Sequence, residues 1–286
     1  MSSLNIFAFA DEASGQIDKQ IAAMQRNSPQ GLEIRGVDGQ SIADISMEKA
    51  REVRRKMDDA GLTVWSMGSP IGKIGIEDDF AAHLDKLRHV LELADVLGAE
   101  NVRMFSFFVP EGKAADYRSK VIDQVGQMVQ VAHGSGIALC HENEKDIYGD
   151  IGARCKVILD ELASPNFKAA FDFANFVQCG ENTEECWELL KEHVAYIHIK
   201  DAVAGKNENV VCATGDGKIP EILKKAIRED GYEGFLTLEP HLVLFATLQS
   251  LEVVDATEVI SENKAKDGAE GYAMQYNALC EVLKAI

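Results

Sequence analysis

Short apolar runs alternate with longer amphipathic segments along this chain, and the alternation repeats eight times. Segments such as 47–60 and 80–97 carry apolar residues three or four positions apart, as expected of helices with one buried face. This order is typical of successive strand–helix units around a parallel sheet. Eight units predict an α/β protein with a (β/α)8 TIM-barrel fold. The predicted strands are 5–10, 31–36, 62–67, 101–107, 137–142, 168–172, 195–199 and 235–239.

Glycines mark the ends of the predicted helices, where a left-handed residue commonly stops a helix. They are Gly61, Gly98, Gly134, Gly136 and Gly231. Since no linker-like tract or change of composition divides the chain, we expect one TIM-barrel domain over 1–286, with an irregular insertion at about 245–268 before the last helix. A doubly wound open sheet would show the same alternation, but no glycine-rich nucleotide-binding motif follows the first strand.

The chain is strongly acidic, with a formal net charge of -18 and a pI near 4.8. Such a charge repels phosphate backbones and anionic lipid surfaces, so neither nucleic acid nor a membrane is an expected partner. The sequence shows no apolar run of membrane-spanning length and no basic, signal-like start, which predicts a cytoplasmic protein. The six cysteines form no CxxC pair, so we expect reduced thiols.

Acidic or imidazole side chains stand at the carboxyl ends of the last four predicted strands. They are Glu142, Asp172, His198 and Glu239, each separated from the next by about one strand–helix unit. In a barrel they should meet at one rim, where three carboxylates would repel one another without a cation. A lone acid after a strand is more often a helix cap, but the same position in four consecutive units is hard to ascribe to capping. The pattern predicts a divalent metal site.

Three oxygen ligands and one imidazole favour a hard or borderline metal ion. We expect Mn²⁺ first, with Mg²⁺, Co²⁺ and Zn²⁺ as alternatives.

Further polar residues near the same strand ends are candidate substrate-binding groups. Their basic members could hold hydroxyls, a carboxylate or a phosphate. The residues equally allow an internal ion pair between Arg103 and Glu33, with Lys73 merely solvated. The candidates are Arg35, Lys73, Arg103, Glu144, Asn175, Lys200 and His241.

Three motifs carry a resemblance to the xylose isomerase-like TIM barrels, the superfamily of sugar isomerases and sugar-phosphate isomerase/epimerases that also contains endonuclease IV. They are HENE at 141–144, HIKD at 198–201 followed by GDG at 215–217, and GFLTLEPH at 234–241. The resemblance covers essentially the whole chain and implies the same four metal ligands. The additional histidines that endonuclease IV relatives place after strands two and three are absent. Ketose 3-epimerases of the family usually carry a histidine where this chain has Asn175, which argues against a tagatose- or psicose-type substrate.

The resemblance implies a metal-dependent sugar or sugar-phosphate isomerase/epimerase of carbohydrate metabolism, and homo-oligomers are common in that family. Glu142 and Glu239 are the expected catalytic residues, moving a proton while the metal ion stabilises an enediolate. Two alternatives stay open. One is a dehydratase or lyase acting on an inosose-type polyol with the same metal site, and the other is a sugar-binding barrel without catalysis.

Overall fold

Eight parallel strands close into a barrel in the computed structural model, which describes residues 4–27, 29–206, 208–245, 260 and 264–286. Around the barrel each strand pairs in parallel with the next, and the last returns to the first. The predicted (β/α)8 fold is therefore confirmed. The strands are β1 (Asn5–Ala8), β2 (Gly31–Ile34), β5 (Thr63–Gly68), β6 (Asn101–Met104), β7 (Ala138–Glu142), β8 (Phe167–Asp172), β9 (Val194–Ile199) and β12 (Phe235–Leu238).

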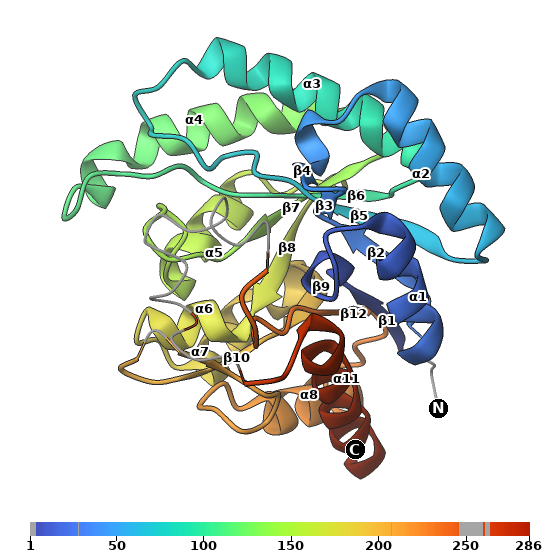
Figure 1. Cartoon of the computed structure of the whole chain (residues 1–286). Coiled ribbons are helices and arrows are strands. Elements are labelled where there is room, and N and C mark those ends of the chain that lie inside the picture. The colour runs from blue at the N-terminus through green and yellow to red at the C-terminus, as the bar shows by residue number, and fades with distance from the viewer. Residues whose placement is uncertain (1–3, 28, 207, 246–259, 261–263) are drawn as a thin grey trace.

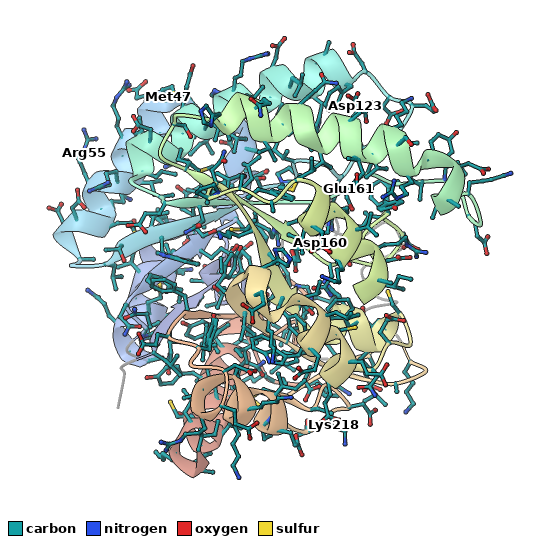
Figure 2. The ribbon with its side chains drawn as sticks, turned by 180° about the vertical axis from the view of Figure 1, so that it is seen from behind. Met47, Arg55, Asp123, Asp160, Glu161 and Lys218 are labelled. Carbon is teal, nitrogen blue, oxygen red and sulfur yellow. The ribbon has the colours of Figure 1, made fainter. Side chains whose placement is uncertain are left out.

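Helices surround the barrel, with α2, α3 and α4 together on one side and α8 and α11 on the opposite side (Figure 1). Exposed charged residues of these helices, among them Arg55, Asp123 and Glu161, project from their outer faces (Figure 2). No described helix is both long and apolar enough to cross a membrane. The helices are α1 (Ile17–Asn27), α2 (Met47–Asp59), α3 (Phe80–Leu97), α4 (Ala114–Ala132), α5 (Gly152–Glu161), α6 (Phe173–Gln178), α7 (Thr183–Leu190), α8 (Ile219–Arg228) and α11 (Gly268–Ala285).

The loops that connect the strands to the helices contain short hairpins and turns of 3-10 helix. A hairpin of β3 (Gly36–Val37) and β4 (Gln40–Ser41) follows β2, and a hairpin of β10 (Asp201–Val203) and β11 (Glu208–Val210) follows β9. Single turns of 3-10 helix lie at Ala10–Glu12, Ile42–Asp44 and Lys191–His193. The hairpin after β9 places the GDG motif against Asp201, since Gly215 and Gly217 both donate to that carboxylate.

Helix ends follow local sequence rules. The side chains of Ser46 and Asp79 accept backbone hydrogen bonds at the starts of α2 and α3, which satisfies amides that the helix itself leaves unpaired. Gly98 ends α3 with φ of 74°, a left-handed conformation that costs glycine little. The other glycines predicted to follow helices also have positive φ, namely Gly61, Gly134, Gly136 and Gly231.

Three predicted strands are too long by two or more residues. The second was expected to reach residue 36 but ends at Ile34. The fourth was expected to reach residue 107 but ends at Met104, because the Phe105 and Phe107 amides donate to the carbonyls of Ile71 and Gly72 in the preceding loop. The first ends at Ala8 because the chain turns into the 3-10 helix Ala10–Glu12. Most of the predicted insertion, residues 246–259 and 261–263, lies outside the described residues.

Aromatic residues fill the amino-terminal half of the barrel interior. The Trp65 ring centroid lies 4.3 Å from that of Phe235 and 4.8 Å from that of Tyr196, and the Phe7 ring stacks on Trp65 at 5.3 Å. Such pairs contribute about 0.5–1.5 kcal/mol each beyond area burial. Because this end is closed by apolar rings, the polar side chains of the interior gather at the carboxyl-terminal mouth.

His83 should make stability depend on pH. Its Nε2 accepts a hydrogen bond from the Gly72 amide at 2.8 Å, and burial, aided by Lys86, lowers its pKa from 6.5 to about 4. The stabilisation is therefore complete above pH 6.5 and is lost as the pH falls towards 4, by roughly 3 kcal/mol at most. His83→Gln keeps an acceptor and should flatten this loss in urea-unfolding measurements. The exposed His133→Gln control should retain the wild-type slope, and an unchanged slope in His83→Gln would contradict the assignment.

Candidate metal centre

Four side chains from neighbouring strands meet at the barrel mouth. Glu142 and Asp172 end β7 and β8, His198 lies in β9, and Glu239 follows β12. All four are buried, and each offers one ligand atom within 4.8 Å of the others. The Nδ1 atom of His198 lies 2.9 Å from Glu142 Oε1, 3.4 Å from Glu239 Oε2 and 3.7 Å from Asp172 Oδ2. The structure thus brings together the residues that the strand ends predicted.

The chemistry of this cluster fits a divalent ion. Asp172 Oδ2 is buried without a hydrogen bond, although the Lys200 ammonium lies 3.1 Å away. Burial raises the pKa of Asp172 despite the charge of Lys200, so its carboxylate is costly without a further cation. Carboxylate oxygens and one imidazole are ligands of hard and borderline metals. The four residues could hold such an ion.

Glu33 orients the histidine of the cluster, a contact that the sequence interpretation missed. Its Oε2 lies 3.0 Å from His198 Nε2, while its Oε1 accepts hydrogen bonds from Tyr196 and Ser66. Burial opposes the charging of His198, but Glu142 and Glu33 raise its pKa well above the usual value. With the Nε2 proton held by Glu33, Nδ1 is the atom that faces the carboxylates, and a metal ion bound there would displace its proton. The sequence signal that could have identified Glu33 is its position as a charged residue between apolar neighbours in the second strand.

Two arginines each bind one glutamate of the cluster. Arg103 Nη1 lies 3.1 Å from Glu142 Oε2, and Arg35 Nη1 lies 2.8 Å from Glu239 Oε1. The alternative pair of Arg103 with Glu33 is therefore wrong. Both guanidinium groups stack over the Phe9 ring, at 4.4 Å for Arg35 and 5.3 Å for Arg103. Each glutamate keeps its other oxygen towards His198.

These contacts keep both glutamates ionised. Burial alone would raise the pKa of Glu142, but His198 and Arg103 outweigh it and lower the pKa to about 2. Burial likewise opposes ionisation of Glu239, and Lys200 with His198 lowers its pKa well below the usual value. An ionised carboxylate can accept a proton or bind a cation.

The lysines of the mouth are also paired. Lys200 Nζ lies 3.1 Å from Asp172 and 3.4 Å from Glu239, and these charges raise its pKa well above the usual value against the effect of burial. Lys73 forms an ion pair with Glu144 at 3.0 Å and lies over the Phe105 ring, so it is not merely solvated.

The last two candidates lie against the glutamates. Asn175 donates to Glu142 Oε1 at 3.4 Å and to the Asn143 carbonyl at 2.9 Å. His241 Nε2 has no hydrogen-bond partner and lies 3.5 Å from both Glu12 Oε1 and Glu239 Oε1. Burial lowers the pKa of His241 well below its usual value, so it is a neutral group facing carboxylates. Together with Glu12 and Glu239 it forms a second cluster with metal-ligand spacing, in which Arg35 already supplies a cation.

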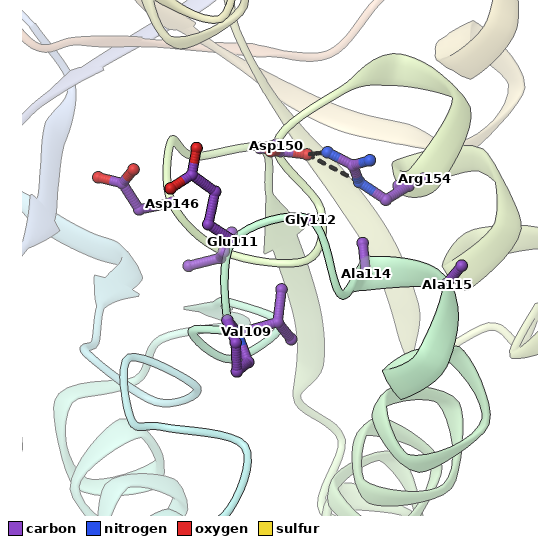
Figure 3. Close-up of a pocket in the computed structure, with 10 residues that line it drawn as sticks. Val109, Glu111, Gly112, Ala114, Ala115, Asp146, Asp150 and Arg154 are labelled. Atoms are coloured by element: carbon purple, nitrogen blue, oxygen red, sulfur yellow. Dashed lines mark hydrogen bonds and ion pairs between the residues drawn. The ribbon is translucent and has the colours of Figure 1, made fainter.

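A separate pocket of about 470 Å³ opens between the loops that follow β6 and β7 (Figure 3). None of its lining residues belongs to the four-residue cluster. Glu111, Asp146 and Asp150 contribute acidic groups, and the only basic lining residue, Arg154, is bound to Asp150.

The sequence matches the family model described as "Xylose isomerase-like TIM barrel" over residues 29–257. No curated protein matches the sequence.

Solved structures share the fold at low sequence identity. The IOLI protein with a bound zinc atom is 13% identical, with a TM-score of 0.76 and 99% of each chain covered. The D-allulose 3-epimerase from Methylomonas sp., in complex with D-allulose, is 16% identical, with a TM-score of 0.75 and coverage of 98% of this chain and 97% of that one. The probable 3-DHS dehydratase AsbF from Bacillus anthracis is 14% identical, with a TM-score of 0.71 and coverage of 97% and 99%. At these identities the likeness shows the fold.

We predict that Glu33→Gln weakens metal binding by about 10- to 100-fold, because the acceptor that orients His198 loses its charge. Titration calorimetry with Mn²⁺ on the metal-free protein would measure the change. The control is Ser66→Ala, which keeps the Glu33 carboxylate and removes one hydrogen bond of 3.3 Å. Wild-type affinity in a folded Glu33→Gln variant would show that Glu33 does not position the ligand.

Proposed function

This chain belongs to the xylose isomerase-like TIM barrel family, and we propose that it is a divalent-metal-dependent sugar isomerase or epimerase. The observation that carries the proposal is the buried cluster of Glu142, Asp172, His198 and Glu239 at the carboxyl-terminal mouth. Catalytic groups of TIM-barrel enzymes lie at this end of the strands. The similar structures named as an allulose epimerase and a zinc-containing IOLI protein support the reaction class and the metal by analogy.

Glu142 and Glu239 are the proposed proton carriers. They come from β7 and β12, which β8 and β9 separate in the barrel, so they approach a substrate at the centre from different sides. Both are ionised at neutral pH and ready to accept a proton from carbon. Arg103 and Arg35 each hold one oxygen of a carboxylate, and the other oxygen of each faces His198 at the centre of the cluster. Transfer between two faces of a planar intermediate gives epimerisation, whereas return by one residue gives isomerisation.

The same four residues would hold the metal, for which we propose Mn²⁺. A bound divalent ion would supply Lewis-acid polarisation of the substrate carbonyl and its neighbouring hydroxyl. Lys200, Asn175 and His241 are the proposed substrate contacts of this chain, since each is buried beside a cluster carboxylate. Of these, His241 Nε2 offers a polar atom that still lacks a hydrogen-bond partner.

Replacing either proton carrier should slow hydrogen exchange at the reacting carbon. We expect Glu142→Gln and Glu239→Gln each to slow incorporation of deuterium from D2O into a panel of ketoses by about 10²- to 10⁴-fold, read by proton NMR. The matched control is Glu100→Gln, an exposed glutamate at the opposite end of the barrel, which should exchange at the wild-type rate. Undiminished exchange in both glutamine variants would refute the roles, and loss of water from an inosose would favour the dehydratase alternative.

Removing the metal should remove the activity while the barrel stays folded. Treatment with EDTA followed by gel filtration is expected to reduce exchange to background, and added Mn²⁺ should restore it better than Mg²⁺ or Zn²⁺. Circular dichroism before and after treatment controls for unfolding. Full exchange in protein shown to be metal-free by elemental analysis would contradict the proposal.

A further inference from the structure

We propose that the substrate is an uncharged polyhydroxy carbonyl compound, and that this chain excludes phosphate esters because its own carboxylates already occupy the groups that would bind a phosphate. The proposal rests on the proposed function and narrows its substrate class. A phosphate ester carries nearly two negative charges at neutral pH and needs cationic side chains or unpaired backbone amides to bind.

The cationic side chains of the mouth are engaged. Arg35 binds Asp11, Glu12 and Glu239, and Arg103 binds Glu142. These groups are almost fully buried, so a phosphate would have to displace a carboxylate from each of them.

Two lysines of the mouth are engaged in the same way. Lys200 lies within ion-pair distance of Asp172 and Glu239. Lys73 reaches from the loop after β5 to Glu144 in the loop after β7, where the exposed fractions of the two side chains are only 13% and 14%. Lys145, next to Glu144, also has an interaction within the protein. Arg35, Arg103, Lys73 and Lys200 are therefore each paired with a carboxylate of the protein.

Backbone amides in the loop after β9 are occupied too. TIM barrels frequently bind phosphate at the loops that follow the seventh and eighth strands. In this chain the loop after the seventh barrel strand, β9, aims the amides of Ala202, Gly215 and Gly217 at the side chain of Asp201, at 2.9–3.0 Å. A carboxylate of the protein thus fills the place where a phosphate would accept hydrogen bonds. Any Cβ on Gly215 or Gly217 would come within 2.4–2.7 Å of its neighbours, so the loop is shaped around this carboxylate.

The surplus charge around the mouth is negative. Carboxylates outnumber cations among the buried residues there. One divalent ion offsets part of this surplus, and an approaching dianion is still repelled. Hydroxyl groups meet no such barrier.

The test compares the Mn²⁺-loaded full chain with D-fructose, D-fructose 6-phosphate and inorganic phosphate as probes, with binding followed by NMR line broadening. The wild type should bind D-fructose 6-phosphate no more tightly than D-fructose. Glu144→Gln should release Lys73 and tighten the binding of inorganic phosphate and of the ester by about fivefold, the scale of one partly desolvated ion pair. The control is Glu111→Gln, which removes the same charge from an exposed residue without releasing a cation and should bind phosphate as the wild type does.

Tighter binding of the phosphate ester than of the free sugar by the wild type would overturn the proposal, and so would the absence of any gain in Glu144→Gln. If no ketose exchanges deuterium while Glu144→Gln still gains phosphate binding, the proposed reaction fails and the exclusion of phosphate stands.

Discussion

The electrostatic balance around His198 is the constraint on which the rest of this structure depends. Glu142, Asp172 and Glu239 surround Nδ1 of the imidazole and Glu33 contacts Nε2. All of them are buried in a barrel whose opposite end is closed by aromatic rings. Buried charges of one sign cost several kcal/mol each unless they are compensated. The chain compensates with Arg35 and Arg103 on the outer oxygens of the two glutamates, and with Lys200 beside the inner oxygens of Asp172 and Glu239.

This balance links the fold to the chemistry. A closed parallel barrel delivers the end of every strand to one mouth, so residues far apart in the sequence share a site that rigid strands hold. The same ion pairs that hold the glutamates also neutralise the positively charged side chains of the mouth. Positioning of Glu142 by Arg103 and selection for neutral ligands are therefore two consequences of one arrangement.

Much of this architecture could be predicted from the sequence. The eight strands and the convergence of Glu142, Asp172, His198 and Glu239 follow from the period of the strand–helix units, because in a barrel that period returns each strand end to the same rim. The left-handed glycines after helices follow from local sterics. These features depend on the local sequence pattern or on the closure of the β-barrel.

The pairing of the charges could not be predicted, because it depends on where long side chains end after the strands take their register. From the sequence, Arg103 could form an ion pair with Glu33 or with Glu142. Only the structure distinguishes the two pairings, because Glu33 contacts His198. The end of β6 at Met104 was also missed, since the loop at Ile71 and Gly72 competes for the amides that a longer strand would use.

The most direct test of the central claim is anomalous diffraction at the manganese absorption edge from crystals grown with Mn²⁺. We predict one peak among the inner oxygens of Glu142, Asp172 and Glu239 and the Nδ1 atom of His198, at about 2.0–2.3 Å from each, the range of metal bonds to oxygen and imidazole ligands. A map without a peak there, or with its only peak elsewhere, would contradict the account.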